Sequence, residues 1–414
     1  MPIKGIISLP GDKSVSHRAL MLASLSDGAC VINNISTGDD VETTRKCLYQ
    51  CGIKSSKLGS SVEITGGTLS SPVQPLDCGN SGTTVRLMAG LLSGQGLIVR
   101  LVGDKSLSKR PMNRIIEPLE KMGVTIQSNN GFLPISINSG DVQSIDYSPS
   151  VSSAQVKSSI LLAGLGASGE SIIREEIPTR DHTELMLKEL GANINQGENI
   201  TINPLLKPLS SFEMTIPGDP SSASFFAAAA AMIPNSDLTI KNVLANPTRI
   251  GFFSIMESMG ADITWKNLKK VAGEFVGDVH ILCQPLNGLH IMKEMIPSII
   301  DEIPIIAVLA TQANSPTIIE GAQELRVKES DRIKAICDNL KSMGGDVIEK
   351  KDGFIINPPF ILSPAKIQTF DDHRIAMAFI IAGLLTTKRN ILDNQDCINI
   401  SFPEFNQILD QIYQ

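Results

Sequence analysis

Six stretches of the chain repeat one pattern of hydrophobic and polar residues. Each begins with a run rich in Ala, Leu, Ile and Gly, passes through a short polar turn and ends in a β-branched segment. This pattern predicts a helix followed by a strand. The six copies cover residues 18–34, 86–102, 158–175, 224–242, 303–321 and 375–394. Marker residues in the predicted strands recur about every 70 residues, and they are Val31, Ile98, Ile172, Thr239, Ile318 and Ile391.

A second pattern recurs between these stretches, as an amphipathic helix that ends in glycine and runs into a strand. The glycines are Gly52, Gly123, Gly191, Gly260 and Gly344. Glycine at this position predicts a helix C-cap in the left-handed backbone region. A sixth helix begins near residues 402–412, where too little chain remains for the following strand. The N-terminal segment 3–10 is available to supply that strand.

This arrangement predicts two domains of three repeats each. If the N-terminal strand joins the C-terminal repeats, one domain consists of residues 1–12 plus 219–414 and the other of residues 13–218. The tripeptide Pro10-Gly11-Asp12 recurs as Pro217-Gly218-Asp219, which marks the two crossings as hinge strands. Helices of the first pattern are apolar nearly all round and should be buried, with the strands outside. The expected fold is therefore a mixed α/β, two-domain, inside-out α/β barrel.

Composition narrows the functional classes. The 414 residues suit two domains, and a net charge of −7 argues against a broad nucleic-acid surface. Seven scattered cysteines fit neither a disulfide framework nor a zinc site, and the absence of an HxH or HExxH pair predicts no metal. No segment has the length of a membrane span, and Gly-Asp-Lys follows the N-terminus too soon for a signal peptide. We therefore expect a cytoplasmic protein without nucleic-acid or membrane partners.

Basic residues concentrate at the starts of the repeat helices. Residues 11–18 (GDKSVSHR) and 103–110 (GDKSLSKR) are nearly the same sequence. Helix N-termini favour anions, and adjacent Lys or Arg would complete an anion site; capped helices with solvated surface charge are the alternative. Lys328 and Arg332 would be repelling like charges at i and i+4 if both are helical, unless an anion lies between them. The cations that suit phosphate and carboxylate groups are Lys13, Arg18, Arg86, Arg110, Lys157, Arg180, Lys328, Arg332 and Arg374.

Further motifs point to a ligand loop and to proton chemistry. Residues 79–87 (GNSGTTVRL) form a glycine and hydroxyl loop that enters an apolar helix, with a simple capped turn as the alternative. The GxGxxG match at 164–169 falls at a helix end, the reverse of a dinucleotide site. Asp301 and Glu302 are flanked by Ile and Pro, so partial desolvation should favour a general base there, whereas Glu329 sits in a basic run. A helix cap or a salt bridge is the alternative for each.

Nine ordered motifs together resemble the 5-enolpyruvylshikimate-3-phosphate (EPSP) synthase family over essentially the whole chain. They are LPGDKSVSHR, GNSGTTVRL, KRP, SSAQVKS, TRDHTE, PGDPSSAS, IDEIPI, LRVKESDRI and DDHRIAMAF. The resemblance implies six βαβαββ units, three per domain, with the substrates between the domains. It also implies transfer of the enolpyruvyl group of phosphoenolpyruvate to the 5-hydroxyl of shikimate 3-phosphate, a step of aromatic amino acid biosynthesis, by a monomer without cofactor or metal.

The resemblance also assigns residues, with the phosphoenolpyruvate side and the proton acceptor in the discontinuous domain. Catalytic roles fall to Asp301 as proton acceptor, Glu329 at the methylene proton and Lys13 near the hydroxyl. The residues implied to bind shikimate 3-phosphate are Lys13, Ser14, Arg18, Ser153, Ala154, Gln155, Arg180, Asp301 and Lys328. Those implied to bind phosphoenolpyruvate are Lys13, Gly82, Arg110, Gln155, Arg332 and Arg374.

Three positions depart from the family pattern, and two rival functions remain. Some relatives have a serine at Ala154 and a lysine at Ile400, and His17 replaces a common asparagine. A UDP-N-acetylglucosamine enolpyruvyl transferase would carry a cysteine at the position of Lys105. A non-catalytic clamp built from such repeats would need a basic inner face and no acid-base pair. The candidate cations are split between residues 13–180 and 301–374, with hinges near Asp12 and Asp219, which predicts an open cleft that closes when shikimate 3-phosphate bridges the two domains. The resemblance further implies sensitivity to glyphosate, because resistant relatives carry alanine at Gly82.

Overall fold

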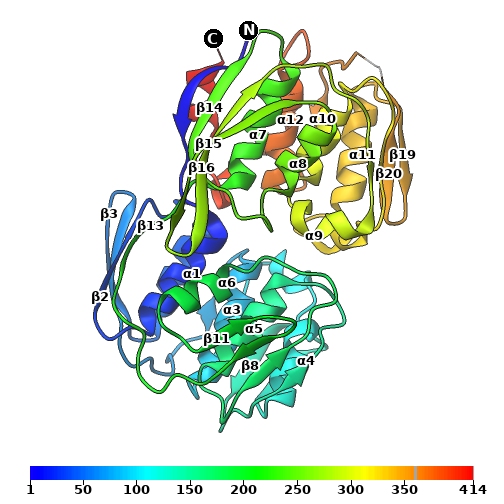
Figure 1. The fold of residues 1–414 in the computed structure, drawn as a ribbon. Helices are drawn as coiled ribbons and strands as arrows, with labels where there is room; N and C mark the ends of the chain where they lie inside the picture. Colours follow the sequence, from blue (N-terminus) through cyan, green and yellow to red (C-terminus); the bar gives the residue numbers. More distant parts are fainter. Residues whose placement is uncertain (359–360, 414) are drawn as a thin grey trace. The chain divides into compact units, whose positions relative to one another are not determined.

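The computed structural model describes residues 1–358 and 361–413. The chain divides into two compact units (Figure 1). Unit 1 consists of Met1–Pro10, Pro217–Lys270 and Phe275–Gln414, and unit 2 of Gly11–Ile216 and Val271–Glu274. Within the described residues, no helix combines the length and the apolar character that crossing a membrane requires.

Unit 2 contains three repeats, each with an inner helix, an outer helix and a sheet. The inner helices are α1 (Lys13–Ser24), α3 (Gly82–Gly94) and α5 (Ala154–Gly164), and the outer helices are α2 (Asp39–Gln50), α4 (Asn113–Lys121) and α6 (His182–Glu189). One sheet has the order β13 (Glu213–Thr215), β2 (Ala29–Asn33), β4 (Ser61–Thr65), β3 (Lys54–Leu58). The second sheet has the order β5 (Leu76–Asp77), β6 (Ile98–Val102), β8 (Phe132–Asn138), β7 (Thr125–Asn129). The third sheet has the order β9 (Asp146–Tyr147), β10 (Ser171–Ile173), β12 (Ile200–Ile202), β11 (Ile194–Gln196).

Unit 1 repeats the plan. Its inner helices are α7 (Pro220–Met232), α10 (Ile303–Ala310) and α12 (His373–Gly383), accompanied by α8 (Gly251–Ser258), α9 (Ile296–Ile299), α11 (Arg332–Ser342) and α13 (Phe405–Ile412). One sheet has the order β1 (Lys4–Ser8), β14 (Asp237–Leu244), β16 (Glu274–Leu282), β15 (Asp262–Val271). The others are β17 (His290–Ile291), β18 (Thr317–Ile319), β20 (Gly353–Ile356), β19 (Val347–Lys350), and the pair β21 (Lys366–Ile367), β22 (Ile391–Leu392). Short 3₁₀ turns are η1 (Leu107–Lys109), η2 (Lys293–Met295), η3 (Gln323–Val327) and η4 (Asp396–Ile400).

The predicted sixfold repeat is confirmed strand by strand. The six marker residues lie in β2, β6, β10, β14, β18 and β22, and each of these strands pairs in parallel with one other strand. In five of the sheets an antiparallel hairpin continues the order on the other side. The N-terminal strand β1 is the parallel partner of β14, and β13 is that of β2. Each unit therefore includes one sheet completed by a strand from far away in the sequence.

The helix-ending glycines adopt the predicted left-handed conformation. Their φ angles lie between 84° and 96° at Gly52, Gly123, Gly191, Gly260 and Gly344. An L-residue with a side chain pays a steric cost in this region, which explains why glycine recurs at each helix end.

The inside-out arrangement is visible in the burial of the inner helices. Every residue of α10 is buried, whereas the strands alternate between buried and exposed positions. In unit 2, α3 and α5 approach so closely that a Cβ atom added at Gly90 would lie 2.1 Å from the carbonyl oxygen of Ser159. In unit 1, α7, α10 and α12 pack against one another (Figure 1). The mixed α/β inside-out prediction is thus confirmed.

Both Pro-Gly-Asp tripeptides cap an inner helix. Asp12 accepts a hydrogen bond from the backbone N–H of Val15 at the start of α1, and Asp219 accepts one from that of Ser221 at the start of α7. The observed units divide beside these caps, at Pro10/Gly11 and at Ile216/Pro217. Unit 2 also includes Val271–Glu274, which the sequence pattern did not indicate. The domains 1–12 plus 219–414 and 13–218 stay a prediction.

Candidate active site

Most of the predicted site residues lie at the N-terminal ends of helices or in the segments just before them, in each of the two units. Unit 2 holds Lys13, Ser14, Arg18, Gly82, Arg110, Ser153, Ala154, Gln155 and Arg180. Unit 1 holds Asp301, Lys328, Glu329, Arg332 and Arg374. Backbone N–H groups at a helix start have no partner within the helix, so these ends are suited to anions.

One cluster in unit 2 surrounds Gly82, the first residue of α3. A Cβ atom added at Gly82 would lie 3.0 Å from Nη1 of Arg86 and 3.3 Å from Nη1 of Arg110. Arg86 donates to Oε1 of Gln155 at 2.6 Å, and Arg110 donates to Oδ1 of Asn80 at 2.6 Å. Two guanidinium groups and a helix N-terminus thus converge at a position without a side chain. This arrangement fits a phosphate or carboxylate group.

Arg18 is buried, and three of its guanidinium nitrogens are held by the protein. It donates to Thr183 Oγ1 at 2.7 Å, to Ser158 Oγ at 2.7 Å and to the carbonyl oxygen of Ser14 at 2.9 Å. Burial, with a smaller contribution from the nearby charge of Arg180, lowers the pKa of Arg18 to about 10. The like charge of Arg180 brings a second cation to this part of unit 2, where an anion would be stabilised by both.

Lys13 and His17 show how the start of α1 is arranged. Lys13 donates to Oδ2 of Asp40 at 2.9 Å and is partly exposed. His17 is buried, and its Nδ1 lies 2.7 Å from Oγ1 of Thr44. Burial, assisted by the charges of Lys13 and Arg18, lowers the pKa of His17 well below its ordinary value. His17 is therefore neutral, so the position that departs from the family pattern adds no cation.

The remaining residues of unit 2 line the start of α5 and the loop before α6. Ser153 is the N-cap of α5 and Ala154 its first residue, both half-buried. Lys157 lies deeper: its Nζ is 2.8 Å from Oε2 of Glu175 and 2.7 Å from Oε1 of Glu184, and the side chain is 1% exposed. Two carboxylates therefore balance the charge of Lys157.

In unit 1 the two predicted acids lie among cations. Oδ1 of Asp301 is 3.9 Å from Nζ of Lys328 and 3.5 Å from Nη1 of Arg332. Oε2 of Glu329 accepts from Nη2 of Arg332 at 2.6 Å. Arg332 is buried, whereas both acids are partly exposed. Two carboxylates thus share one buried guanidinium, which fixes their positions relative to each other.

Sequence reasoning missed Asp372, which joins two of the motifs. Asp372 caps α12 by accepting from the backbone N–H of Arg374, and it also accepts from Ser330 Oγ and from the guanidinium of Arg332. Its position in an Asp-Asp-His-Arg run was the available signal, but nothing in the sequence indicates which carboxylate turns inward.

The like-charge argument for Lys328 and Arg332 does not hold. Lys328 has an extended backbone at the end of η3, and α11 begins only at Arg332. The two side chains are not neighbours on one helix face, and Asp301 lies near both.

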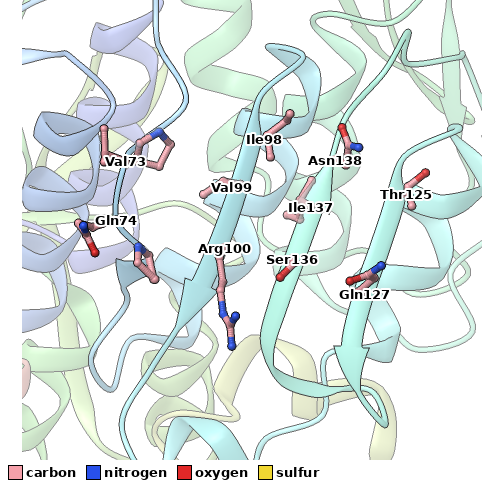
Figure 2. A pocket seen from close by; sticks show the side chains of 12 residues that line it. Val73, Gln74, Ile98, Val99, Arg100, Thr125, Gln127, Ser136, Ile137 and Asn138 are labelled. Atoms are coloured by element: carbon pink, nitrogen blue, oxygen red, sulfur yellow. The ribbon is translucent and has the colours of Figure 1, made fainter.

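A groove of about 460 Å³ lies elsewhere in unit 2, on the sheet of β6, β8 and β7 (Figure 2). The labelled side chains of Ile98, Arg100, Gln127 and Ser136 line it, together with the segment 72–75. None of its twelve lining residues belongs to the predicted site, and Arg100 is the single charged one.

Comparison with known proteins decides the family. The family described as EPSP synthase (3-phosphoshikimate 1-carboxyvinyltransferase) matches residues 1–409. The chain belongs to the EPSP synthase family. A 3-phosphoshikimate 1-carboxyvinyltransferase of Oceanobacillus iheyensis is 46% identical over 415 residues, covering 99% of this chain and 97% of that protein. One of Thermoanaerobacter is 42% identical over 414 residues, with 99% and 98% covered.

Solved structures agree with this assignment. An EPSP synthase from Acinetobacter baumannii superposes with a TM-score of 0.87 at 39% identity, covering 99% of this chain and 96% of that one. The enolpyruvyl transferase NikO from Streptomyces tendae superposes with a TM-score of 0.80 at 15% identity, covering 100% and 95%, and shows a shared fold. Membership in the EPSP synthase family confirms the resemblance first read from the nine motifs.

Proposed function

We propose that the chain transfers the enolpyruvyl group of phosphoenolpyruvate to the 5-hydroxyl of shikimate 3-phosphate. The products are 5-enolpyruvylshikimate 3-phosphate and phosphate. As a member of the EPSP synthase family, the chain is a transferase of the shikimate pathway. The full-length family match is the observation that carries the proposal. Action as a cytoplasmic monomer stays a prediction from the sequence.

The proposed chemistry is an addition followed by an elimination. The 5-oxygen bonds to C2 of phosphoenolpyruvate and loses its proton, while the methylene carbon gains one. Phosphate then leaves as the new methyl group returns a proton and the double bond forms again. The reaction therefore needs a group that accepts the hydroxyl proton and a group that exchanges the carbon-bound proton.

The site residues are proposed in matching roles. Asp301 accepts the hydroxyl proton, Glu329 handles the methylene proton, and Lys13 lies near the hydroxyl. Support comes from the position of both acids beside Arg332, 3.5 Å from Asp301 and 2.6 Å from Glu329. Nearby cations stabilise the ionised carboxylate that a general base requires.

The anionic groups of the substrates are assigned to the cations. We propose that Ser14, Arg18, Ser153, Ala154, Gln155, Arg180 and Lys328 bind shikimate 3-phosphate with Lys13 and Asp301. Phosphoenolpyruvate is assigned to Gly82, Arg110, Arg332 and Arg374, with contributions from Lys13 and Gln155. The convergence of Arg86 and Arg110 on Gly82 supports this assignment and adds Arg86 to the cluster. Arginine suits these groups because its planar fork matches carboxylate and phosphate oxygens.

Phosphate release tests the function and the base together. We expect phosphate to be released from phosphoenolpyruvate only when shikimate 3-phosphate is present. UDP-N-acetylglucosamine is tested in parallel as the acceptor of the rival transferase. Asp301→Ala should lower turnover by about 10²- to 10⁴-fold, the contribution typical of a general base. Asp410→Asn, an exposed acid of the same unit paired with Arg389, is the control and should keep full activity. Release with UDP-N-acetylglucosamine instead would favour the UDP-N-acetylglucosamine enolpyruvyl transferase. No release with either acceptor would favour the non-catalytic clamp.

A further inference from the structure

Glu302 is a buried acid that the proposed reaction does not use. The sequence singles it out beside Asp301, but the two carboxylates have different surroundings: Asp301 is partly exposed, whereas Glu302 is 1% exposed. Glu302 is the N-cap residue of α10, where the helix dipole stabilises a negative charge. Its side chain makes no cap hydrogen bond to the helix. The carboxylate is therefore turned to partners outside α10.

Those partners lie at the N-terminal ends of the other two inner helices of unit 1. Oε1 of Glu302 accepts a hydrogen bond from Oγ of Ser221, the second residue of α7. The same oxygen lies 3.7 Å from Nη1 of Arg374, the second residue of α12. The helices α7, α10 and α12 thus meet through three side chains near their first turns.

The direction of the hydrogen bonds is fixed by arginine chemistry. Arg249 donates from Nη2 to Oγ of Ser221 at 3.0 Å and to Oδ1 of Asp219 at 3.2 Å. A guanidinium only donates, so the Ser221 oxygen accepts from Arg249 and its single proton goes to Glu302. Oε1 of Glu302 is consequently an acceptor. The chain from Asp219 through Arg249 and Ser221 holds the carboxylate in one orientation.

The orientation of the Arg374 guanidinium depends on a single acid, Glu302, whereas that of Arg332 depends on several. Arg332 is held by Asp372, by Glu329 and by the nearby Asp301. Within residues 1–358 and 361–413, Glu302 is the only acidic residue that forms an ion pair with Arg374. A guanidinium with one such partner loses its preferred orientation when that partner is removed.

The buried carboxylate of Glu302 also lowers the stability of the folded protein. Its second oxygen, Oε2, is buried and has no hydrogen-bond partner among the described residues. A buried polar atom without a partner destabilises the folded state, so packing alone would favour an apolar residue here. Local violations of this kind are typical of functional sites.

We propose that Glu302 is a positioning residue for phosphoenolpyruvate: it orients the guanidinium of Arg374, and Ser221 and Arg249 orient Glu302. This inference rests on the proposed function, in which Arg374 binds phosphoenolpyruvate. Nη1 of Arg374 faces Glu302, which leaves Nη2 and Nε to meet the oxygens of an anion. Glu302 touches neither substrate in this proposal and acts only through Arg374.

Glu302→Gln tests the charge and keeps the shape. Glutamine retains an oxygen that accepts from Ser221 and loses the charge that faces Arg374. We expect kcat/KM for phosphoenolpyruvate to fall by about 10- to 100-fold, the range of a charge-assisted interaction. The KM for shikimate 3-phosphate should stay within about twofold, because its proposed ligands lie mainly in unit 2. Glu320→Gln, an exposed acid of unit 1 paired with Lys350, is the matched control and should resemble the parent protein.

Ser221→Ala provides a second test in case the glutamine variant does not fold. Removing the hydroxyl leaves the charge of Glu302 in place and frees its orientation, so the same substrate-selective loss should appear in smaller size. Ser222→Ala, at the neighbouring position of α7, is the control and should have no effect.

Several outcomes would overturn the proposal. Unchanged kinetics in Glu302→Gln with a folded protein would remove Glu302 from any positioning role. A lower KM for phosphoenolpyruvate would mean that Glu302 competes with the anion. An equal loss for both substrates with a lowered unfolding midpoint would indicate a structural role only. Arg374→Lys tests the role of Arg374 separately from the transferase function of the chain. Full activity in that variant would refute the proposed binding of phosphoenolpyruvate by Arg374 without contradicting the transferase function.

Discussion

Arg332 and Asp372 form a two-point ion pair inside unit 1. Nε of Arg332 lies 2.8 Å from Oδ2 of Asp372, and Nη2 lies 3.2 Å from Oδ1. The two side chains are 1% and 0% exposed. The carboxylate of Asp372, with the charges of Glu329 and Asp301, raises the pKa of Arg332 although burial opposes this. The pair ties the first residue of α11 to the cap of α12, so it fixes both ends that carry predicted phosphoenolpyruvate ligands.

Asp372→Asn should therefore reduce both stability and turnover. Removing one partner of a buried ion pair costs about 3–5 kcal/mol when the other charge is left uncompensated. We expect a smaller loss here, because Glu329 still pairs with Arg332. Urea unfolding would measure the free energy of unfolding, and the phosphate assay would measure turnover. Asp338→Asn, an exposed acid on α11 paired with Lys334, is the control and should leave the unfolding midpoint in place. An unchanged midpoint in Asp372→Asn would contradict the structural reading of this pair.

The neutral, buried His17 predicts a loss of stability in acid. Burial lowers its pKa in the folded protein below the ordinary value of 6.5. As pH falls below 6.5, the unfolded chain takes up a proton that the folded chain does not, so stability declines by up to about 1.4 kcal/mol per pH unit until the folded pKa is reached. His17→Asn should remove this part of the slope between about pH 5 and 6.5.

The measurement is the free energy of unfolding in urea at several pH values from 5 to 8. His290→Asn changes an exposed histidine in unit 1 and is the comparison. Parallel pH profiles for His17→Asn and the parent protein would argue against a neutral His17 in the folded state.

Gly82→Ala should weaken binding of phosphoenolpyruvate and of glyphosate. The added Cβ would lie 3.0 Å from Nη1 of Arg86 and 3.3 Å from Nη1 of Arg110, so both guanidinium groups would have to move. We expect the parent enzyme to be inhibited by glyphosate and the variant to need about tenfold more, equivalent to roughly 1.4 kcal/mol of lost binding. Steady-state kinetics would measure the glyphosate concentration needed to inhibit each of the two proteins.

Gly140→Ala provides the matched control for this substitution. Among the described residues other than the two chain neighbours of Gly140, no atom lies within 4 Å of a Cβ added there, so that change should have no effect on inhibition. A parent enzyme that turns over unimpaired at millimolar glyphosate would refute the expected sensitivity.

Local sequence patterns were sufficient to predict the repeat architecture. A helix face is set by residues three or four apart and a strand face by residues two apart, so the six repeats could be read without any tertiary information. The glycine C-caps could be predicted for the same reason, since the left-handed backbone at Gly52 or Gly260 is a requirement of that position alone. The two Pro-Gly-Asp tripeptides were interpreted as hinge strands, and only the structure shows that Asp12 and Asp219 cap α1 and α7.

The partners of charged residues required the tertiary structure. Lys157 and Arg18 look alike in the sequence as cations near helix starts, yet Lys157 is paired with Glu175 and Glu184 whereas Arg18 donates to neutral oxygens. The return of β13 to pair with β2 was also absent from the prediction, because the separation between two strands along the chain does not specify their pairing.

The sequence by itself determined the sixfold repeat, the helix caps and the motifs that place this chain in its family. Only the tertiary structure decided that Asp372 holds Arg332, that Arg86 and Arg110 converge on Gly82, and that Glu302 faces Arg374. The physical reason is distance along the chain: repeats and caps depend on near neighbours, whereas Glu302 and Arg374 are 72 residues apart and meet only because α10 and α12 pack together.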